Sequence, residues 1–181
     1  MAIKTTAQLI AEIAALFPDN NTELITPAAV RLSLGNIVDS MTPSFGALRG
    51  VTPVVAALTT VPVQLNIFDT VIVSTPGQLV ASAVADNIIT VVGNIVQFSF
   101  TISMAGANNS DVQVELRRNG VATGWLALQT TLGAANRVVM TLAGYTVAGS
   151  GDIYTLWGSV LAGADNVTMS ASAFIMQRVQ Q

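Results

Sequence analysis

The sequence predicts a mainly β protein, an antiparallel β-sandwich of jelly-roll type preceded by a short N-terminal helical hairpin. Three observations carry this prediction. From Val96 to Met104 apolar and polar residues alternate, which is the pattern of a half-buried antiparallel strand. The next alternating run ends at Asn119-Gly120, two residues that easily adopt the positive φ angles of a two-residue hairpin turn. Turn signals then recur about every 8–12 residues, as they do in sandwiches and jelly rolls.

Two amphipathic helices joined by a polar turn are predicted over residues 1–41. A capping-box pattern begins at Thr5, and Pro18 with the polar residues after it ends the first helix. Thr26 and Pro27 begin the second helix as N-cap and first helical residue. Such a hairpin has too little core to fold alone, so we expect it to dock on its own β domain or on a partner. The apolar stripes of the two helices contain Leu9, Ile10, Ile13, Leu16 and Phe17, and then Val30, Leu34, Ile37 and Met41.

The rest of the chain divides at its prolines. Residues 42–62 are predicted to form an extended arm or edge strand, because Pro43, Pro53 and Pro62 argue against continuous central strands. Residues 63–181 are predicted to form the β-sandwich, with turn residues between its strands. Candidate strands lie at 63–68, 70–75, 78–84, 88–92, 95–104, 111–118, 121–130, 137–143, 152–161 and 166–178.

The composition favours an obligate oligomer. Of the 181 residues 51% are hydrophobic and only 9% are charged, against a usual charged share of about 25%. A chain of this length forms one medium domain, with or without a small appendage. With so few charges to cover its surface, we expect apolar area to be buried between subunits. Membrane insertion is not expected, because polar residues interrupt the longest candidate stretch, Gln78–Val96, well short of about 18 apolar residues.

Other functional classes are disfavoured by residues that the sequence lacks. The net charge is −3 and no basic patch is present, which disfavours nucleic-acid binding. Cysteine is absent, so disulfides and thiol chemistry are excluded. Histidine is also absent, which removes the commonest general base and the commonest metal ligand. The start Met1-Ala2-Ile3-Lys4 has no signal-peptide hydrophobic region, so we expect a protein made in a cytoplasm that does not use the usual secretory route.

No pattern in the sequence indicates a catalytic, cofactor or metal site, and we predict a protein that is not an enzyme. Glu115 and Asp152 are conceivable as the carboxylate pair of a glycosidase, but nothing in the sequence brings them together. The aspartates in turns lack the spacing of known calcium loops. Trp125 and Trp157 are able to stack on sugar rings, although packing in a core or interface is the favoured interpretation.

Four segments occur in a characteristic order. Val96–Ile102 has alternating aromatics, Val114–Gly120 ends in an Asn-Gly turn, Gly151–Leu156 begins with Gly-Asp, and Ala173–Val179 is a closing strand. In this order and spacing they resemble the C1q/TNF-like trimeric jelly roll found in many bacteriophage virion proteins. The loop at 133–136 has no distinctive family signature.

The N-terminal piece resembles a second group. Asp19-Asn20-Asn21 and Ile25-Thr26-Pro27 are similar to a turn and a helix start in the opening segment of phage fibre and decoration proteins. Together the two resemblances cover most of the chain except about 50–90. They imply a homotrimer made in the host cytoplasm and located in the virion. They also imply that it decorates or cements the capsid, or forms a short head fibre, with the major capsid protein or other virion proteins as partners.

The alternative function is a tail-fibre or spike module that recognises a host surface glycan, because the same jelly roll serves both roles. For the structural role, we expect the hairpin (1–41) and the arm (42–62) to dock into the virion, and the sandwich (63–181) to trimerise through strands that are apolar on both faces. The predicted virion-anchoring residues are Leu9, Ile13, Leu16, Val30, Leu34 and Ile37. The predicted trimer-interface residues are Tyr154, Leu156, Val160, Phe174 and Met176.

Overall fold

The structure is a computed structural model that describes residues 8–9, 11–12, 15, 32–34, 37, 44–75 and 77–179. The chain divides into two compact units, one of Met1–Pro43 with Val179–Gln181 and one of Ser44–Arg178. Within the first unit, the described residues in both predicted helices are helical. No helix among the described residues is long and apolar enough to cross a membrane.

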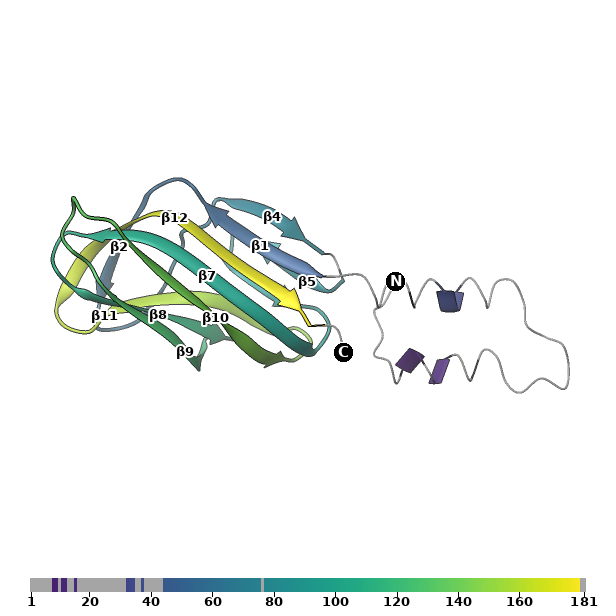
Figure 1. Ribbon diagram of the computed structural model, residues 1–181. Coiled ribbons are helices and arrows are strands. Elements are labelled where there is room, and N and C mark those ends of the chain that lie inside the picture. The colour runs from purple at the N-terminus through teal and green to yellow at the C-terminus, as the bar shows by residue number, and fades with distance from the viewer. Residues whose placement is uncertain are drawn as a thin grey trace, which may run out of the picture. The chain divides into compact units, whose positions relative to one another are not determined.

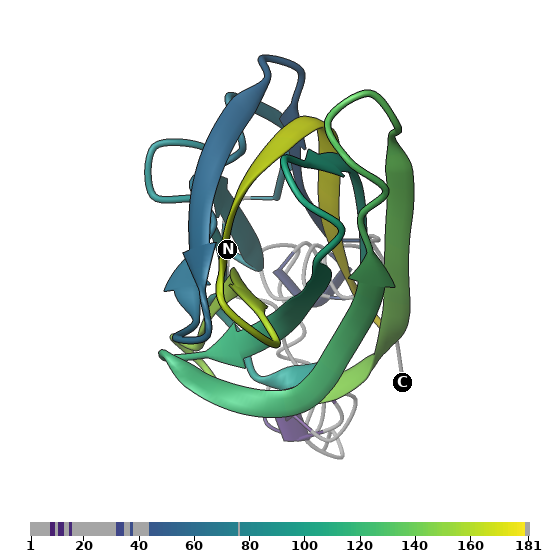
Figure 2. The ribbon, with the colours of Figure 1, turned by 90° about the vertical axis from the view of Figure 1, so that its left-hand side faces the viewer.

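The second unit is a sandwich of two antiparallel sheets (Figures 1 and 2). Sheet A has the strand order β10-β7-β12-β1-β4, with β2 beside β12, and sheet B has the order β5-β6-β11-β8-β9, with β3 beside β11. The predicted fold class is confirmed, and each of the ten predicted strands is present. The strands are β1 (Phe45–Gly50), β2 (Val54–Thr59), β3 (Val63–Gln64), β4 (Thr70–Ser74), β5 (Leu79–Ser82), β6 (Asn87–Thr90), β7 (Asn94–Gly106), β8 (Asp111–Arg118), β9 (Val121–Thr130), β10 (Val138–Ala148), β11 (Ile153–Val160) and β12 (Ala164–Arg178).

Residues 42–62 are predicted as an extended arm or an edge strand, and over residues 44–62, which the structure describes, the extended arm is corrected. β1 lies inside sheet A, between β12 and β4, and β2 pairs with β12. The sandwich therefore begins at Ser44 instead of residue 63. The physical reason is that Pro53 lies between β1 and β2 and Pro62 lies between β2 and β3, so neither proline removes a ladder hydrogen bond.

The core lies between the two sheets and is built by the predicted alternation. On β7 the side chains of Phe98, Phe100 and Ile102 are buried, whereas the polar residues between them lie on the opposite face of the strand. Phe100 is opposite Phe174 of β12 in the register, so two phenylalanines sit side by side on the inner face of sheet A. The buried aromatic and aliphatic residues of both sheets form one continuous cluster.

One long side of the sandwich is closed by Trp125 of β9. Its ring packs edge-to-face on Phe98, with 5.4 Å between the ring centroids. Gly144 of β10 makes this possible, because a Cβ atom there would lie 2.9 Å from the Trp125 ring. Trp125 therefore packs within its own subunit, which is the interpretation that the sequence favours.

The segment between β3 and β4 crosses the sandwich and is held by a buried carboxylate. Phe68 stacks on Phe174 at 6.2 Å, and its N–H donates to Asp86 Oδ1 at 2.7 Å. Asp86 has a φ angle of 48°, a left-handed conformation that Asp and Asn tolerate better than most residues. Burial raises the pKa of Asp86, and the hydrogen bond from Phe68 opposes this shift only in part.

We expect Asp86→Asn to be more stable than the wild type at neutral pH. With a raised pKa, the folded protein binds this proton more tightly than the unfolded chain. The free energy of unfolding therefore rises as the pH falls through the raised pKa, and the gain is complete below the unfolded pKa. Asparagine keeps an acceptor for Phe68 and tolerates the backbone conformation, but it carries no charge to bury. Urea unfolding over a pH series should show the variant's advantage shrinking towards acidic pH.

Asp69 provides the matched comparison, since its pKa is shifted the other way. Its carboxylate accepts the N–H groups of Thr52 and Val51 at 2.9 and 3.0 Å and the Thr70 hydroxyl at 2.8 Å, which lower its pKa well below the usual range. Its contribution to stability is present above the unfolded pKa and is lost as the pH falls. Asp69→Asn should weaken the acid dependence of stability. An Asp86→Asn protein that is less stable than wild type at every pH contradicts this account.

Candidate functional site

The five predicted trimer-interface residues are core residues of a single subunit. Tyr154, Leu156 and Val160 of β11 and Phe174 and Met176 of β12 are at most 1% exposed. Their side chains point between the two sheets of their own sandwich, where no neighbouring subunit reaches them. This prediction is corrected, and the reason is that both faces of these strands are apolar. A surface that contacts a neighbouring subunit must therefore use the residues that alternate with these along each strand.

The outer face of sheet A is made by those alternate residues. We define it by three registered rows that run across the strands β10, β7, β12 and β1, with β4 in the second row. The rows are Tyr145, Gln97, Gln177 and Phe45; Ala143, Ser99, Ile175, Ala47 and Val73; and Thr141, Thr101, Ala173 and Arg49. Arg49 is the one charged residue in these rows. The face therefore combines small side chains with a few large apolar ones, and it lacks the alternating charges of a sheet face that is exposed to solvent.

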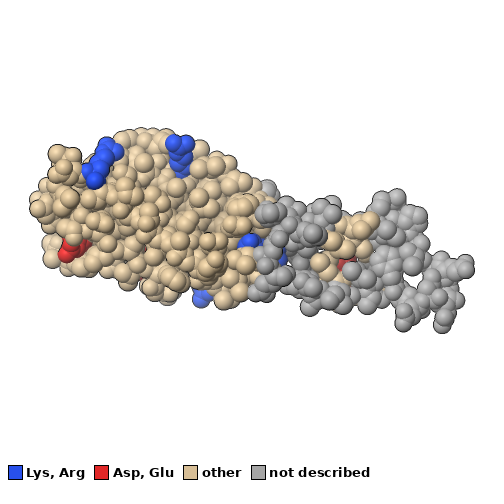
Figure 3. All heavy atoms as spheres, in the orientation of Figure 1, with Lys and Arg blue, Asp and Glu red and all other residues tan. Residues whose placement is uncertain are grey.

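Large apolar side chains stand exposed on this face and along its edge. Tyr145 is 57% exposed and Ile175 is 39% exposed, and Val139 and Val147 extend the exposed row along β10. Figure 3 shows that the visible surface of the Ser44–Arg178 unit bears few charged side chains. Contiguous surfaces of this kind mark contact sites with other proteins more often than free surface.

The neighbouring edge strand of sheet B is apolar as well. Leu126 and Leu128 of β9 are about half exposed. They are opposite Glu115 and Gln113 of β8 in the register, on the outer face of sheet B. Since β9 and β10 are the edge strands of the two sheets on the side that Trp125 closes, one long edge of the sandwich displays aliphatic side chains from both sheets.

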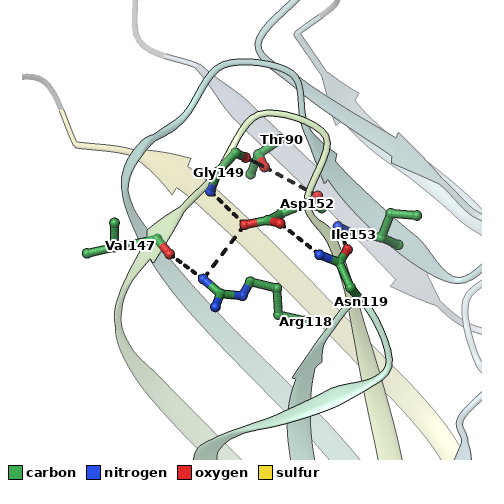
Figure 4. Close-up of polar contacts among 7 residues, drawn as sticks. All are labelled: Thr90, Arg118, Asn119, Val147, Gly149, Asp152 and Ile153. Carbon is green, nitrogen blue, oxygen red and sulfur yellow. Dashed lines mark hydrogen bonds and ion pairs between the residues drawn. The ribbon is translucent and has the colours of Figure 1, made fainter.

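A polar network braces the end of the sandwich that carries the predicted Gly-Asp strand start (Figure 4). Asp152 Oδ2 accepts the N–H of Gly149 at 2.6 Å, and Asp152 Oδ1 accepts from Asn119 Nδ2 at 2.8 Å. Asn119 Oδ1 accepts the N–H of Ile153 at 2.8 Å. Arg118 Nη1 donates to the carbonyl oxygen of Val147 at 2.9 Å and lies 3.8 Å from Asp152 Oδ2. One carboxylate thus ties the Asn-Gly turn to the β10–β11 turn.

The same network reaches a third loop. Thr90 Oγ1 donates to the carbonyl oxygen of Gly149 at 2.7 Å, and the N–H of Gly151 donates to the carbonyl oxygen of Thr90 at 2.6 Å. Asn119 has a φ angle of 53°, as the predicted Asn-Gly hairpin requires. The network fixes the ends of β8, β10 and β11, and so it positions Tyr145 and Val147 at the edge of sheet A.

We expect Asp152→Ala to lower the free energy of unfolding by about 1–3 kcal/mol, because two N–H donors and one cation lose their acceptor. Asp111→Ala is the matched control. Asp111 is exposed and accepts from the Thr130 hydroxyl at 2.5 Å, so its loss should cost less than about 0.5 kcal/mol. Chemical denaturation of both variants checks the difference. Equal losses would show that the network does not brace the loops.

The carboxylates conceived as a glycosidase pair belong to different contacts. Glu115 forms an ion pair with Arg117 at 2.5 Å, and the Arg117 guanidinium lies 4.2 Å from the centre of the Trp157 ring. Asp152 is held in the loop network described above. Among the residues that the structure describes, no group of three or more Asp, Glu, His or Cys residues is placed to hold a metal ion.

The predicted anchoring residues lie in the first unit, and the structure describes three of them. Leu34 is exposed, and Leu9 and Ile37 are half-buried; each is in helical conformation. Ile13, Leu16 and Val30 lie outside the described residues. The anchoring role remains a prediction.

No protein-family model matches the chain, and no curated protein sequence matches it significantly. Solved structures match its fold. Eiger TNF from S. frugiperda superimposes with a TM-score of 0.58 at 9% identity, covering 76% of this chain and 92% of that one. The globular domain of zebrafish complement 1qA gives 0.56 at 10% identity, with 76% and 98% covered. Murine APRIL gives 0.56 at 13% identity, with 76% and 100% covered. The sandwich is therefore a TNF/C1q-like jelly roll.

Proposed function

We propose that the chain is a non-enzymatic structural subunit of a phage virion, which assembles as a homotrimer and decorates or cements the capsid or forms a short head fibre. The observation that carries the proposal is the outer face of sheet A, which is broad, has one charged residue in its three rows, and displays the exposed side chains of Tyr145 and Ile175 with Val139 and Val147 along its edge. Burial of this face against the apolar β9–β10 edge of a neighbouring subunit is a head-to-tail contact. Such contacts close into a ring when the rotation between neighbouring subunits is that of a trimer.

The phage assignment is supported by the order of segments in the sequence. The Asn119-Gly120 turn and the Gly151-Asp152 strand start have defined places in the sandwich, because they meet in the network of Figure 4. The polar turn and Ile25-Thr26-Pro27 of the first unit resemble the opening of phage fibre and decoration proteins. We infer that this unit attaches the trimer to capsid proteins, with Leu9, Leu34 and Ile37 among its contacts.

The trimer is tested by placing a charge at the centre of the proposed interface. Ile175 lies on β12, in the middle row of the outer face of sheet A. We expect Ile175→Lys to convert the trimer into a monomer, because three lysines would be desolvated without partners at the interfaces. Sedimentation velocity should show one trimeric species for the wild type and a monomer for the variant.

Val84→Lys is the matched control, since Val84 is an almost fully exposed valine in the β5–β6 turn of sheet B. It introduces the same charge and should remain trimeric. A monomeric wild type, or equal behaviour of the two variants, contradicts the proposed interface. Cryo-electron microscopy of intact particles tests the location, since density at the tail alone excludes capsid decoration.

A receptor-binding module, at the tip of a tail fibre or spike, is the second candidate function. One observation favours it. The chain enters and leaves the Ser44–Arg178 unit at a single end, where Phe45 pairs with Gln177, so the loops at the opposite end carry no connection to the rest of the chain. In this candidate function, those loops contact the host surface.

A further inference from the structure

The free end of the sandwich carries a small open pocket of about 170 Å³. It lies where Ala164, at the start of β12, pairs with Thr59, at the end of β2. Arg178, at the other end of β12, donates its N–H to the carbonyl oxygen of Ser44. The pocket and the chain connections are therefore at opposite ends of the same strand, and the pocket end faces the viewer in Figure 2.

The apolar part of the pocket is aliphatic. The completely buried Leu58 lies at its floor, and the exposed residues Ala57, Ala107 and Ala164 surround it. These short side chains leave a shallow hollow that accepts C–H groups and has no room for a long chain. We call this site the distal pocket.

The polar part of the distal pocket is organised around Asp165, whose side chain is only 3% exposed. Its Oδ1 accepts the N–H of Ala107 at 3.0 Å and of Asn108 at 3.2 Å. Its Oδ2 accepts the N–H of Asn108 at 3.3 Å and lies beside Gly106, where a Cβ atom would be 2.4 Å from it. Asp165 therefore belongs to the buried floor of the pocket. The exposed side chains of Asn108, Asn166 and Thr59 add amide and hydroxyl groups around it.

The charge of the distal pocket restricts its ligand. Among the residues that the structure describes, Asp165 is the one charged residue that lines it, so an anionic group would be repelled. A bare cation is poorly served as well, because the described residues place no second carboxylate beside Asp165 and its own charge already holds N–H donors. The chemistry that fits is neutral, with hydroxyl donors on one side and aliphatic C–H groups on the other.

We propose that the distal pocket binds one neutral sugar unit of a saccharide, with its hydroxyls on the exposed polar groups of Thr59, Asn108 and Asn166 and its C–H face on the exposed Ala57 and Ala164. The pocket is smaller than the roughly 300–1,000 Å³ of sites for drug-sized ligands, which limits it to a single unit. This inference rests on the receptor-binding candidate above. With so few contacts we expect a dissociation constant on the order of 1 mM for one copy. Three copies in a trimer would raise the apparent affinity for a polysaccharide.

The experiment is an amide chemical-shift titration of the full chain, with deuteration because of the size of a trimer. The probes are glucose, galactose and N-acetylglucosamine, with glucosamine, glucose 6-phosphate and Ca²⁺ as charged comparisons. We expect one or more neutral sugars to shift the amide signals of Ala107, Asn108 and Ala164. Ala164→Leu, which fills the pocket from an exposed position, should weaken binding at least about tenfold.

Ala162→Leu is the control, because Ala162 is exposed in the adjacent loop and does not line the pocket. The proposal is overturned if no neutral sugar shifts these amides, if both leucine variants bind alike, or if a charged probe or Ca²⁺ binds in preference. Sedimentation velocity on the same samples separates the two proposals. If the protein is a trimer that binds no sugar, only the proposed distal pocket is contradicted. If it is a monomer that binds sugar, the proposed trimer interface is contradicted and the distal pocket is supported.

Discussion

Replacing Gly50 by alanine should unfold the sandwich or lower its free energy of unfolding by about 3 kcal/mol or more. Gly50 is the last residue of β1, and it lies against the segment that leads to β4. A Cβ atom there would lie 1.9 Å from the carbonyl oxygen of Ile67 and 2.4 Å from Ser172 Oγ. The first of these is a backbone atom, and Ser172 is paired with Gly50 across the β1–β12 ladder. A change of rotamer can move the Ser172 hydroxyl, but only a shift of the backbone can relieve the clash with Ile67.

Gly77→Ala is the control for this effect. Gly77 has a φ angle of 82°, but a Cβ atom there would meet no other atom within 4 Å, so alanine encounters conformational strain without a clash. Its cost should stay near 1–2 kcal/mol, roughly the penalty of a left-handed residue. Thermal and urea unfolding of both variants measure the difference. Equal destabilisation would mean that the close approach at Gly50 relaxes at little cost.

Phe174→Ala should destabilise each subunit by about 3–5 kcal/mol, the usual cost of deleting a buried phenylalanine. Phe174 is fully buried, lies opposite Phe100 in the register and stacks on Phe68, so its loss opens a cavity beside these two rings. The rigid β-ladder on either side of β12 limits how far that cavity can collapse.

Ile175→Ala is the neighbouring control, because its side chain is on the outer face of sheet A. A conservative truncation there should change the stability of the isolated subunit by less than about 1 kcal/mol. It should instead weaken the proposed trimer, which analytical ultracentrifugation at several concentrations detects. If Ile175→Ala unfolds the subunit and Phe174→Ala only dissociates the trimer, the inner and outer faces of β12 have been assigned wrongly.

This pair of residues also shows how far the sequence alone predicts the molecule. Alternation on β7 located its core residues, because polar side chains marked the other face. On β11 and β12 both faces are apolar, and the residues predicted for the interface belong to the core. A strand's period separates two faces, but it does not say which of them meets the partner sheet. That assignment depends on pairings between strands far apart in the chain.

The strands β1 and β2 illustrate a second limit. Three prolines between residues 42 and 62 predicted an arm, yet Pro53 and Pro62 stand just outside short strands whose partner, β12, lies more than a hundred residues away. The distal pocket had no signal at all in the sequence. It is formed by Asp165, at the start of β12, and Asn108, in the β7–β8 loop, which only the sheet pairing brings together.

The pairing of Phe45 with Gln177 gives the sandwich a practical modularity. Because the incoming and outgoing chains run side by side, the unit can be inserted into a surface loop of another protein without stretching its host. The same proximity permits a circular permutant, with a short Gly/Ser linker joining residue 178 to residue 44 and new termini between Ala162 and Gly163. Such a permutant reverses which end of the sandwich is tethered.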